Sequence, residues 1–324
     1  MIDRRQLIAG SAASLLVASR ATAQTVKKPV HIIVGFPAGG GTDVTARVLA
    51  EGLRGPYSSA VLVENKPGAS ARLAVEYVKN AEPDGSVMLF TPDFPMTLYP
   101  HSFKTLSYDP LKDFVAVGPA TKSMLSFNVG PMVPPSVKTP KDYVEWCKAN
   151  PAKSAYGTTS AGATPHFAGV MFASEAKVAM EPVHYRGGAP ALQDVVGGHI
   201  AASVNPISES MPLHQGGSIR ILAVTGGARS KFLPDVPTMK EQGFDVVVES
   251  WLGVFLPPKT PNEITQALSK AMDQAVHSAA MIESLAKFAS EPLFQTPAEF
   301  VETIKSDLKR WGPVVKASGF VAVD

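Results

Sequence analysis

Short apolar runs alternate along the chain with segments whose apolar residues recur at helical spacing. Runs such as Val30–Val34 have the length and the β-branched composition of buried strands. This alternation is typical of an α/β fold with a largely parallel sheet. In the first part of the chain it predicts strands at Val30–Val34, Ala60–Glu64 and Ser86–Phe90, and helices at Asp43–Leu53 and Ser70–Asn80.

A second α/β unit is expected after Asp113. A proline-rich connection, Pro131–Pro140, leads there into a helix, and a long amphipathic helix at about Pro297–Ala317 closes the chain. Gly-Gly and Pro-Gly pairs punctuate the pattern as turns. The strands expected in this part are Phe114–Val117, Met124–Val129, Ile200–Asn205 and Ile219–Thr225.

Three of the expected helices follow loops of small residues. The first loop, Gly35–Asp43, contains Gly39-Gly-Gly41, and Thr42 or Asp43 is placed to cap the helix after it. In the second loop, Thr158–Thr164, Thr164 is expected as the N-cap and Pro165 as the first helical residue. The third is Gly187-Gly188, after which Pro190 is expected to begin a helix.

Loops of this kind surround one point with unpaired backbone N–H groups and the positive end of a helix dipole, which favours an anion. In open α/β sheets, ligands bind at the carboxyl ends of strands against helix N-termini. One half of the chain presents one such loop and the other half presents two. This arrangement predicts a small anion held in a cleft between two lobes.

The loops lack the signatures of nucleotide sites. The first has no Gly-Lys-Ser/Thr ending, and Val44 stands where a dinucleotide fingerprint needs glycine. Thr158-Thr-Ser-Ala-Gly162 resembles a nucleophile elbow without its first glycine, so a hydrolase built on Ser160 is an alternative interpretation. No histidine or cysteine spacing indicates a metal site.

Three polar residues near the loops keep two interpretations each. Asp43 is a helix cap or a partner for an ammonium or hydroxyl group of the ligand. His184 is a polar residue of the cleft wall or a ligand contact. Arg186 is a ligand contact or a member of an ion pair.

The composition suits a folded, exported protein. The chain has 324 residues, of which 45% are hydrophobic and 18% charged. Arg4-Arg5, the apolar run Leu7–Ala18 and Ala21-Thr-Ala23 form an export signal over residues 1–23, read by the general secretory or the twin-arginine route. The mature chain is therefore expected to begin near Gln24, to be soluble and to lie in the periplasm. The single cysteine, Cys147, is expected to be buried.

The mature chain is expected to have no net charge. Removal of residues 1–23 removes three of the 30 basic residues and one of the 28 acidic residues, so 27 of each remain. A neutral chain has no general electrostatic surface for nucleic acid or anionic lipid, and any anion recognition must be local.

Across its mature length the chain resembles the substrate-binding proteins of tripartite tricarboxylate transporters, the Bug receptor family. The resemblance rests on an ordered set of motifs: Pro29–Asp43 with Ala46-Arg47, Val63–Gly68, Pro83–Gly85, Tyr156–Gly162 with His166, Tyr185–Pro190, Leu222–Thr225, Leu233–Thr238 and Trp251–Pro257.

The resemblance implies a two-lobe periplasmic binding protein of type II-like fold, each lobe a central sheet flanked by helices. It implies no catalytic role and no cofactor or metal. The receptor would act as a monomer that delivers a di- or tricarboxylate or aromatic acid to integral-membrane permease subunits. A receptor that feeds a two-component sensor kinase is the alternative. Residues 24–120 plus 251–324 would form lobe 1 and residues 121–250 lobe 2, with hinge strands near Val115–Pro119 and Val247–Val254.

The family's ligand contacts carry over by position. The first-lobe contacts would be Phe36, Pro37, Ala38, Gly39, Gly40, Asp43 and Thr91, and the second-lobe contacts would be Thr159, Ser160, Gly162, Ala163, Thr164, His166, Arg186, Gly187, Gly188 and Asn205. Two positions depart from the family pattern. Asn205-Pro206 stands where an Asp and a small polar residue are usual, and Ala163 stands where Gly is common.

Overall fold

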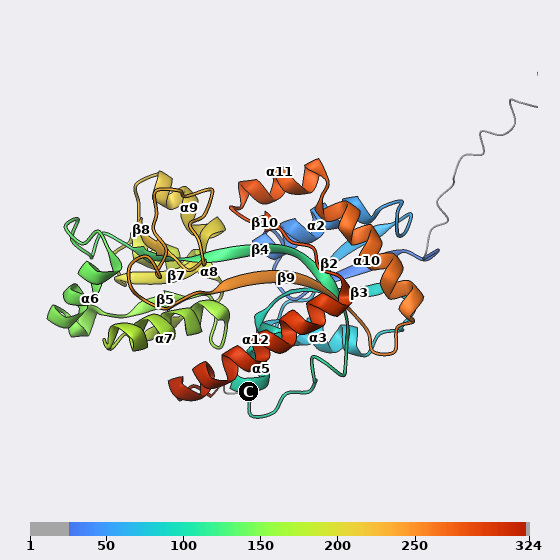
Figure 1. Cartoon of the computed structure of the whole chain (residues 1–324), viewed down its shortest axis with the longest axis horizontal. Coiled ribbons are helices and arrows are strands. Elements are labelled where there is room, and N and C mark those ends of the chain that lie inside the picture. The colour runs from blue at the N-terminus through green and yellow to red at the C-terminus, as the bar shows by residue number, and fades with distance from the viewer. Residues whose placement is uncertain (1–25, 322–324) are drawn as a thin grey trace, which may run out of the picture.

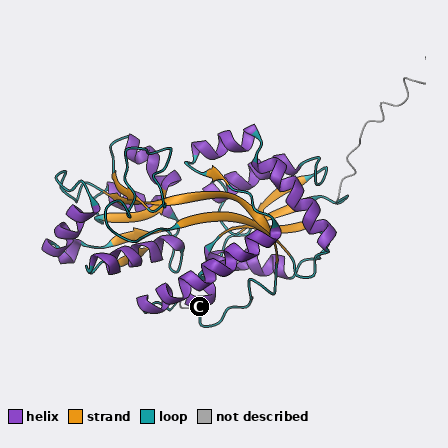
Figure 2. Cartoon of the chain, in the orientation of Figure 1, coloured by secondary structure: helices purple, strands orange, loops and turns teal. Residues whose placement is uncertain are grey.

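The computed structural model describes residues 26–321, so the predicted signal peptide, residues 1–23, lies outside the described part. Two groups of strands and helices lie side by side along the long axis of the molecule. Two long strands, β4 (Val115–Val129) and β9 (Glu249–Leu256), run between these groups (Figures 1 and 2). Within residues 26–321, no helix has the length and apolar character needed to cross a bilayer.

The first group is built on parallel strands. β1 (Val30–Val34) lies between β2 (Val61–Asn65) and β3 (Val87–Pro92), and β9 runs antiparallel to β3. Alternating residues of β1 face opposite sides of the sheet. Ile32 and Val34 pack toward α2 (Gly41–Leu53), α10 (Asn262–Val276) and α11 (Ala279–Lys287), and Ile33 packs toward α3 (Arg72–Lys79), which follows the short helix η1 (Ala69–Ala71).

The second group repeats this plan. β5 (Tyr156–Thr158) lies between β6 (Pro182–His184) and β7 (Ala202–Pro206), all three parallel. One core contains α6 (Pro140–Ala149) and α7 (Thr164–Ala176). Smaller apolar clusters hold α8 (Gly188–Val196), α9 (Ile207–Gln215) and β8 (Arg220–Val224). The short helix η2 (Pro151–Lys153) connects α6 to β5.

β4 belongs to both groups. It is one strand of 15 residues, so the expectation of separate strands at 114–117 and 124–129 is wrong. The strand is continuous because β9 stays paired with it from Val115 to Met124 across two shifts of register. β7 and β8 pair with its remaining residues, and β10 (Glu291–Pro292) pairs with Thr121 and Lys122.

The C-terminal helix α12 (Pro297–Ser318) also spans the two groups (Figure 1). It begins with a capping box between Thr296 and Glu299, and it contacts β4, α4 (Phe94–Thr97), α5 (Tyr99–Ser102) and α7. Trp311 of α12 is fully buried in the same core as Phe167 of α7. One apolar core therefore joins elements on both sides of β4 and β9.

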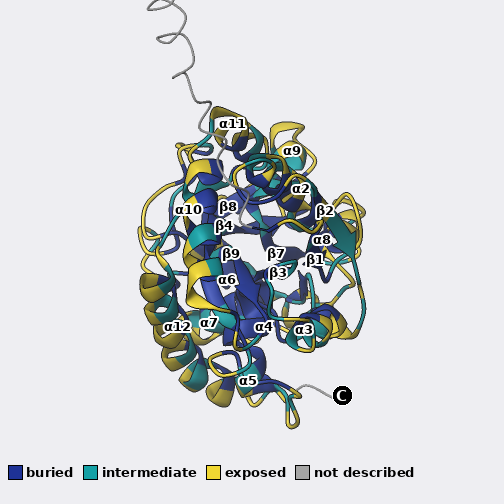
Figure 3. Ribbon diagram, turned by 90° about the vertical axis from the view of Figure 1, so that its right-hand side faces the viewer, coloured by how far each residue is buried: buried dark blue, intermediate teal, exposed yellow. Residues whose placement is uncertain are grey.

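The strands form the buried centre of the molecule, and the helices show exposed residues on their outer faces (Figure 3). Cys147 is buried in α6, as expected, and burial raises the pKa of its thiol to about 11. On α2, Leu49 is buried, whereas Val44 and Val48 are only partly buried. The α/β two-lobe architecture is confirmed, while the predicted lobe limits remain a prediction.

Candidate functional site

The predicted loops lie at the carboxyl ends of strands and lead into uncapped helices. α2, α7, α8 and α9 begin without a side-chain cap, as do α3, α4, α5 and α10, whereas α6, α11 and α12 have Thr or Ser caps. The first N–H groups of a helix have no partner within it. At these helix starts, no side-chain cap satisfies them. The N-cap residues of α2, α7, α8 and α9 are Gly40, Ala163, Gly187 and Pro206.

The expected caps are therefore wrong. α2 begins at Gly41, so Thr42 and Asp43 lie inside its first turn, because Gly40 supplies the extended N-cap backbone. Thr164 is the first residue of α7 rather than its N-cap, and Pro165 is the second. Pro190 lies three residues into α8, which begins at Gly188.

Asp43 holds the first loop in place. It is buried, and its carboxylate accepts hydrogen bonds from the N–H of Gly39 (2.9 Å), from Arg47 (2.9 and 3.0 Å) and from Asn65 Nδ2 (2.9 Å). Burial alone would raise the pKa of Asp43, but these hydrogen bonds outweigh it and hold the pKa below its usual range. The carboxylate is thus fully engaged within the protein.

The rest of the first loop is open. Pro37, Ala38, Gly39 and Gly40 are exposed, and Phe36 is partly buried against Phe94 with ring centroids 6.1 Å apart. Gly39 has φ +85°, which favours glycine. A Cβ on Gly40 would meet only the Pro37 carbonyl oxygen, at 3.6 Å, and one on Gly41 would meet nothing within 4 Å. The N-terminus of α2 therefore faces open space.

Two loops of the second group are joined by backbone hydrogen bonds. The N–H of Tyr185 donates to the Thr158 carbonyl at 2.9 Å, and that of Gly187 donates to the Thr159 carbonyl at 2.8 Å. Ser160 Oγ donates to the Ala161 carbonyl at 3.4 Å, and no histidine is among its hydrogen-bond partners in the described residues. No hydrogen bond or aromatic contact of the described residues joins these loops to Phe36–Gly40.

His166 is a neutral anchor of its own loop. Its Nδ1 accepts a hydrogen bond from the N–H of Gly162 at 3.2 Å. Burial, with His184 4.6 Å away between ring centroids, lowers the pKa of His166 to about 3. His184 is exposed as a residue. The protein around its ring nevertheless removes enough water to lower its pKa as well. Arg186 is exposed and forms no ion pair within residues 26–321, so it supplies the positive charge on this side.

Two predicted residues carry buried oxygens without partners. Thr91 is the second-last residue of β3 and Asn205 the second-last residue of β7. Neither Thr91 Oγ1 nor Asn205 Oδ1 has a hydrogen-bond partner among the described residues. Buried polar atoms are normally satisfied, so each is a place where a ligand or water is expected to bind. Asn205 Nδ2 donates to Glu209 at 3.0 Å, and both residues border Gly188.

Asp93 was not predicted, and it connects three elements. Thr164 Oγ1 of α7 donates to it at 3.0 Å and Ser250 Oγ of β9 at 2.7 Å. Burial raises its pKa to about 7, with Ser250 and Thr164 opposing the shift and Asp307 adding to it. Its sequence signal was its place at the end of β3, directly after Thr91-Pro92.

Phe320, near the C-terminus, was also missed. Its ring lies 4.7 Å from that of His166 and 6.1 Å from that of His184. Together with Tyr99 and Ser102, it borders Gly162, whose φ is +74°. Phe320 therefore packs against the loop that contains Gly162, and no local pattern in the sequence indicates this contact.

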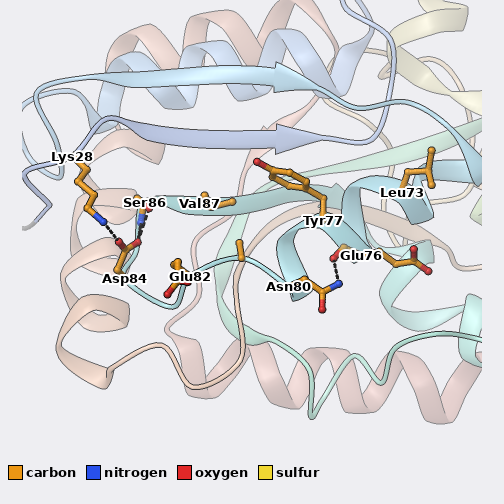
Figure 4. Close-up of a pocket in the computed structure, with 10 residues that line it drawn as sticks. Lys28, Leu73, Glu76, Tyr77, Asn80, Glu82, Asp84, Ser86 and Val87 are labelled. Atoms are coloured by element: carbon orange, nitrogen blue, oxygen red, sulfur yellow. Dashed lines mark hydrogen bonds and ion pairs between the residues drawn. The ribbon is translucent and has the colours of Figure 1, made fainter.

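A groove of about 690 Å³ lies away from these loops (Figure 4). The α3 residues Glu76 and Tyr77 line it, with Asp84, which binds Lys28 at 2.7 Å. Lys28 and Ser86 precede β1 and β3, so the groove lies at the amino ends of the strands. Ligands of open α/β sheets bind at the opposite ends, where the loops lie, so this groove is not at the expected position of a ligand.

Comparisons with known proteins identify a family, relatives and similar folds for this chain. The family model for the "Tripartite tricarboxylate transporter family receptor" matches residues 45–320. The chain is 31% identical over 323 residues to the "UPF0065 protein in gbd 5′region" of Cupriavidus necator, covering 98% of this chain and 97% of that one. The structure of periplasmic binding protein BugD is similar with a TM-score of 0.81 and 28% identity, covering 90% of this chain and 98% of that chain. The structure of R. palustris Rpa4515 with adipate is similar with a TM-score of 0.84 and 28% identity, covering 91% of this chain and 98% of that chain.

Proposed function

The chain belongs to the tripartite tricarboxylate transporter receptor family, and on this basis we propose that it captures a small organic carboxylate between its two lobes. The family match and the Rpa4515 complex with adipate support a carboxylate as the ligand. The observation that carries the proposal is the set of uncapped helix N-termini at strand ends in both lobes.

The carboxylate is held mainly by neutral groups. The N-terminus of α2 offers N–H groups and the positive end of its dipole, over glycines that leave room for the anion. The hydroxyls of Thr91, Thr159 and Ser160 add donors. His166 is neutral at the pH of the periplasm, and Arg186 provides the only cation among the proposed contacts. Binding by helix termini explains how the mature chain, which has no net charge once residues 1–23 are removed, retains an anion.

Capture requires movement between the lobes. β4 and β9 are the strands that connect them, and they are paired along the crossing. A ligand that contacts both lobes shifts the equilibrium toward the closed arrangement. We propose that the closed receptor then docks on permease subunits in the inner membrane, after export to the periplasm.

The test is a thermal-shift screen of the mature chain with succinate, malate, adipate and benzoate. A ligand that binds only the folded state at a hundred times its Kd adds about 2.7 kcal/mol, which raises Tm by several degrees. The diamides of the same acids serve as uncharged controls and should leave Tm unchanged. If no carboxylate raises Tm, or if the diamides raise it equally, the proposal fails.

A further inference from the structure

The carboxylate of Glu209 occupies a fixed place beside the N-terminus of α8. Glu209 is the third residue of α9, and its Oε2 accepts a hydrogen bond from Asn205 Nδ2 at 3.0 Å. A Cβ on Gly188 would lie only 1.6 Å from Oε2 and 2.5 Å from Asn205 Nδ2. The carboxylate can occupy this place because Gly188, the first residue of α8, has no side chain.

Glu209 is accessible to solvent and yet closely surrounded by protein. Its residue surface is exposed, while burial of the carboxyl group raises its pKa against the opposing hydrogen bond of Asn205. Asn205 is its only hydrogen-bond partner among residues 26–321, and no ion pair neutralises it there.

A second acceptor lies at the same place without a donor. Asn205 is fully buried, and its Oδ1 has no partner among the described residues. Its amide orientation follows from the network, because only Nδ2 can donate to the Glu209 carboxylate. A buried acceptor without a donor destabilises the folded protein. Glu209 and Asn205 therefore present two acceptors that need a hydrogen-bond donor.

The opposite end of the proposed site has the complementary character. At the N-terminus of α2 the available groups are backbone donors, and the one acid nearby, Asp43, has its carboxylate filled by Gly39, Arg47 and Asn65. The site is thus polarised locally, with donors at the N-terminus of α2 and two acceptors, Glu209 and Asn205 Oδ1, at the α8–α9 corner. A second ligand carboxylate placed against Glu209 would be repelled.

We propose that Glu209 and Asn205 select a carboxylate ligand whose far end carries a hydrogen-bond donor, such as an ammonium, amide or hydroxyl group, over one that ends in a second carboxylate. This inference rests on the proposed function and names its ligand class. Glu209 acts here as a specificity-determining residue.

The test compares ligands of equal length by isothermal titration calorimetry. The pairs are 4-aminobutanoate with succinate and 6-aminohexanoate with adipate, and succinamate and adipamate add a neutral donor. We expect the native protein to bind the donor-ended acid of the better-fitting length about tenfold more tightly than its dicarboxylate. In Glu209→Gln, that ratio should fall about tenfold, because the ammonium loses its charged partner and the dicarboxylate loses its repulsion.

Glu209→Gln keeps the size of the side chain and an acceptor for Asn205, so the fold should persist, with Tm as the check. The matched control is Glu263→Gln, which removes the acidic residue from the first turn of α10 and should leave the ratio unchanged. The inference is overturned if Glu209→Gln has the native ratio, or if the native protein prefers dicarboxylates. If neither protein binds any of these acids, the proposed function itself fails, and this inference with it.

Discussion

Asp43 and Asp93 are both buried acids at strand–helix junctions, and their surroundings shift their pKa values in opposite directions. Asp43 has its donors close by in the chain, at Gly39, Arg47 and Asn65, and its pKa is lowered. Asp93 depends on Thr164 and Ser250, which are 71 and 157 residues away. Local pattern could therefore draw attention to Asp43, although not to its true partners, whereas for Asp93 it shows only a position directly after β3.

Asp93 should make stability depend on pH. Its folded pKa of about 7 is above the ordinary value of 3.8, so the folded state holds its proton more tightly than the unfolded chain. The free energy of unfolding should therefore fall as pH rises from about 4 to about 7, by at most about 1.4 kcal/mol per pH unit, and this effect should level off above pH 7. Asp93→Asn should flatten this slope in urea unfolding between pH 4.5 and 8.

The exposed Asp245→Asn variant is the control and should keep the native slope. Asp307, whose pKa burial also raises, is present in all three proteins, so a residual slope from Asp307 is expected to remain in Asp93→Asn. Equal slopes in the native protein and in Asp93→Asn would show that Asp93 does not carry this dependence.

At the scale of elements, the sequence identified most of the segments that form strands and helices, but it placed the first residues of several helices wrongly. β1 and the loops after β1, β5 and β6 were predicted correctly, because apolar runs and glycines act locally. Helix starts were misplaced by one or two residues because Gly40, Ala163 and Gly187 serve as N-caps without a side-chain signal. β4 was predicted as two strands because its central residues interrupt the apolar pattern, and only pairing with β9 makes it continuous.

The N-terminus of α2 yields a prediction for the glycine loop. Gly40 has φ −74° and ψ 165°, which any residue can adopt, and a Cβ there has room. Gly40→Val should therefore fold with nearly unchanged Tm, while its side chain blocks approach to the N–H groups of α2. We expect carboxylate affinity, measured by calorimetry, to fall at least about tenfold, as for the loss of a charged hydrogen bond.

The control for Gly40→Val is Gly216→Val. Gly216 is the C-cap residue of α9, with φ −77°, at the end of that helix away from the proposed site. This variant adds the same side chain and should leave affinity unchanged. Native affinity in Gly40→Val would remove the first loop from the site.

At the scale of the whole molecule, the two-lobe plan could be predicted from the alternation of strands and helices together with the family resemblance. The shared core could not. Phe94 and Tyr99, assigned to lobe 1, pack in one cluster with Phe167 of lobe 2 and with Trp311 of α12. Such contacts join residues far apart in the chain, so apolar periodicity does not specify them. The same holds for the contact of Phe320 with His166.

The central claim is that one carboxylate is bound by helix N-termini of both lobes. The most direct test is a backbone amide NMR titration of the deuterated mature chain with the acid that gives the largest thermal shift. The account predicts that amides at Gly39–Asp43 and at Arg186–Gly188 shift together, with one Kd, while those of the groove around Tyr77 stay unchanged. Shifts in one lobe alone, or in that groove instead, would contradict it.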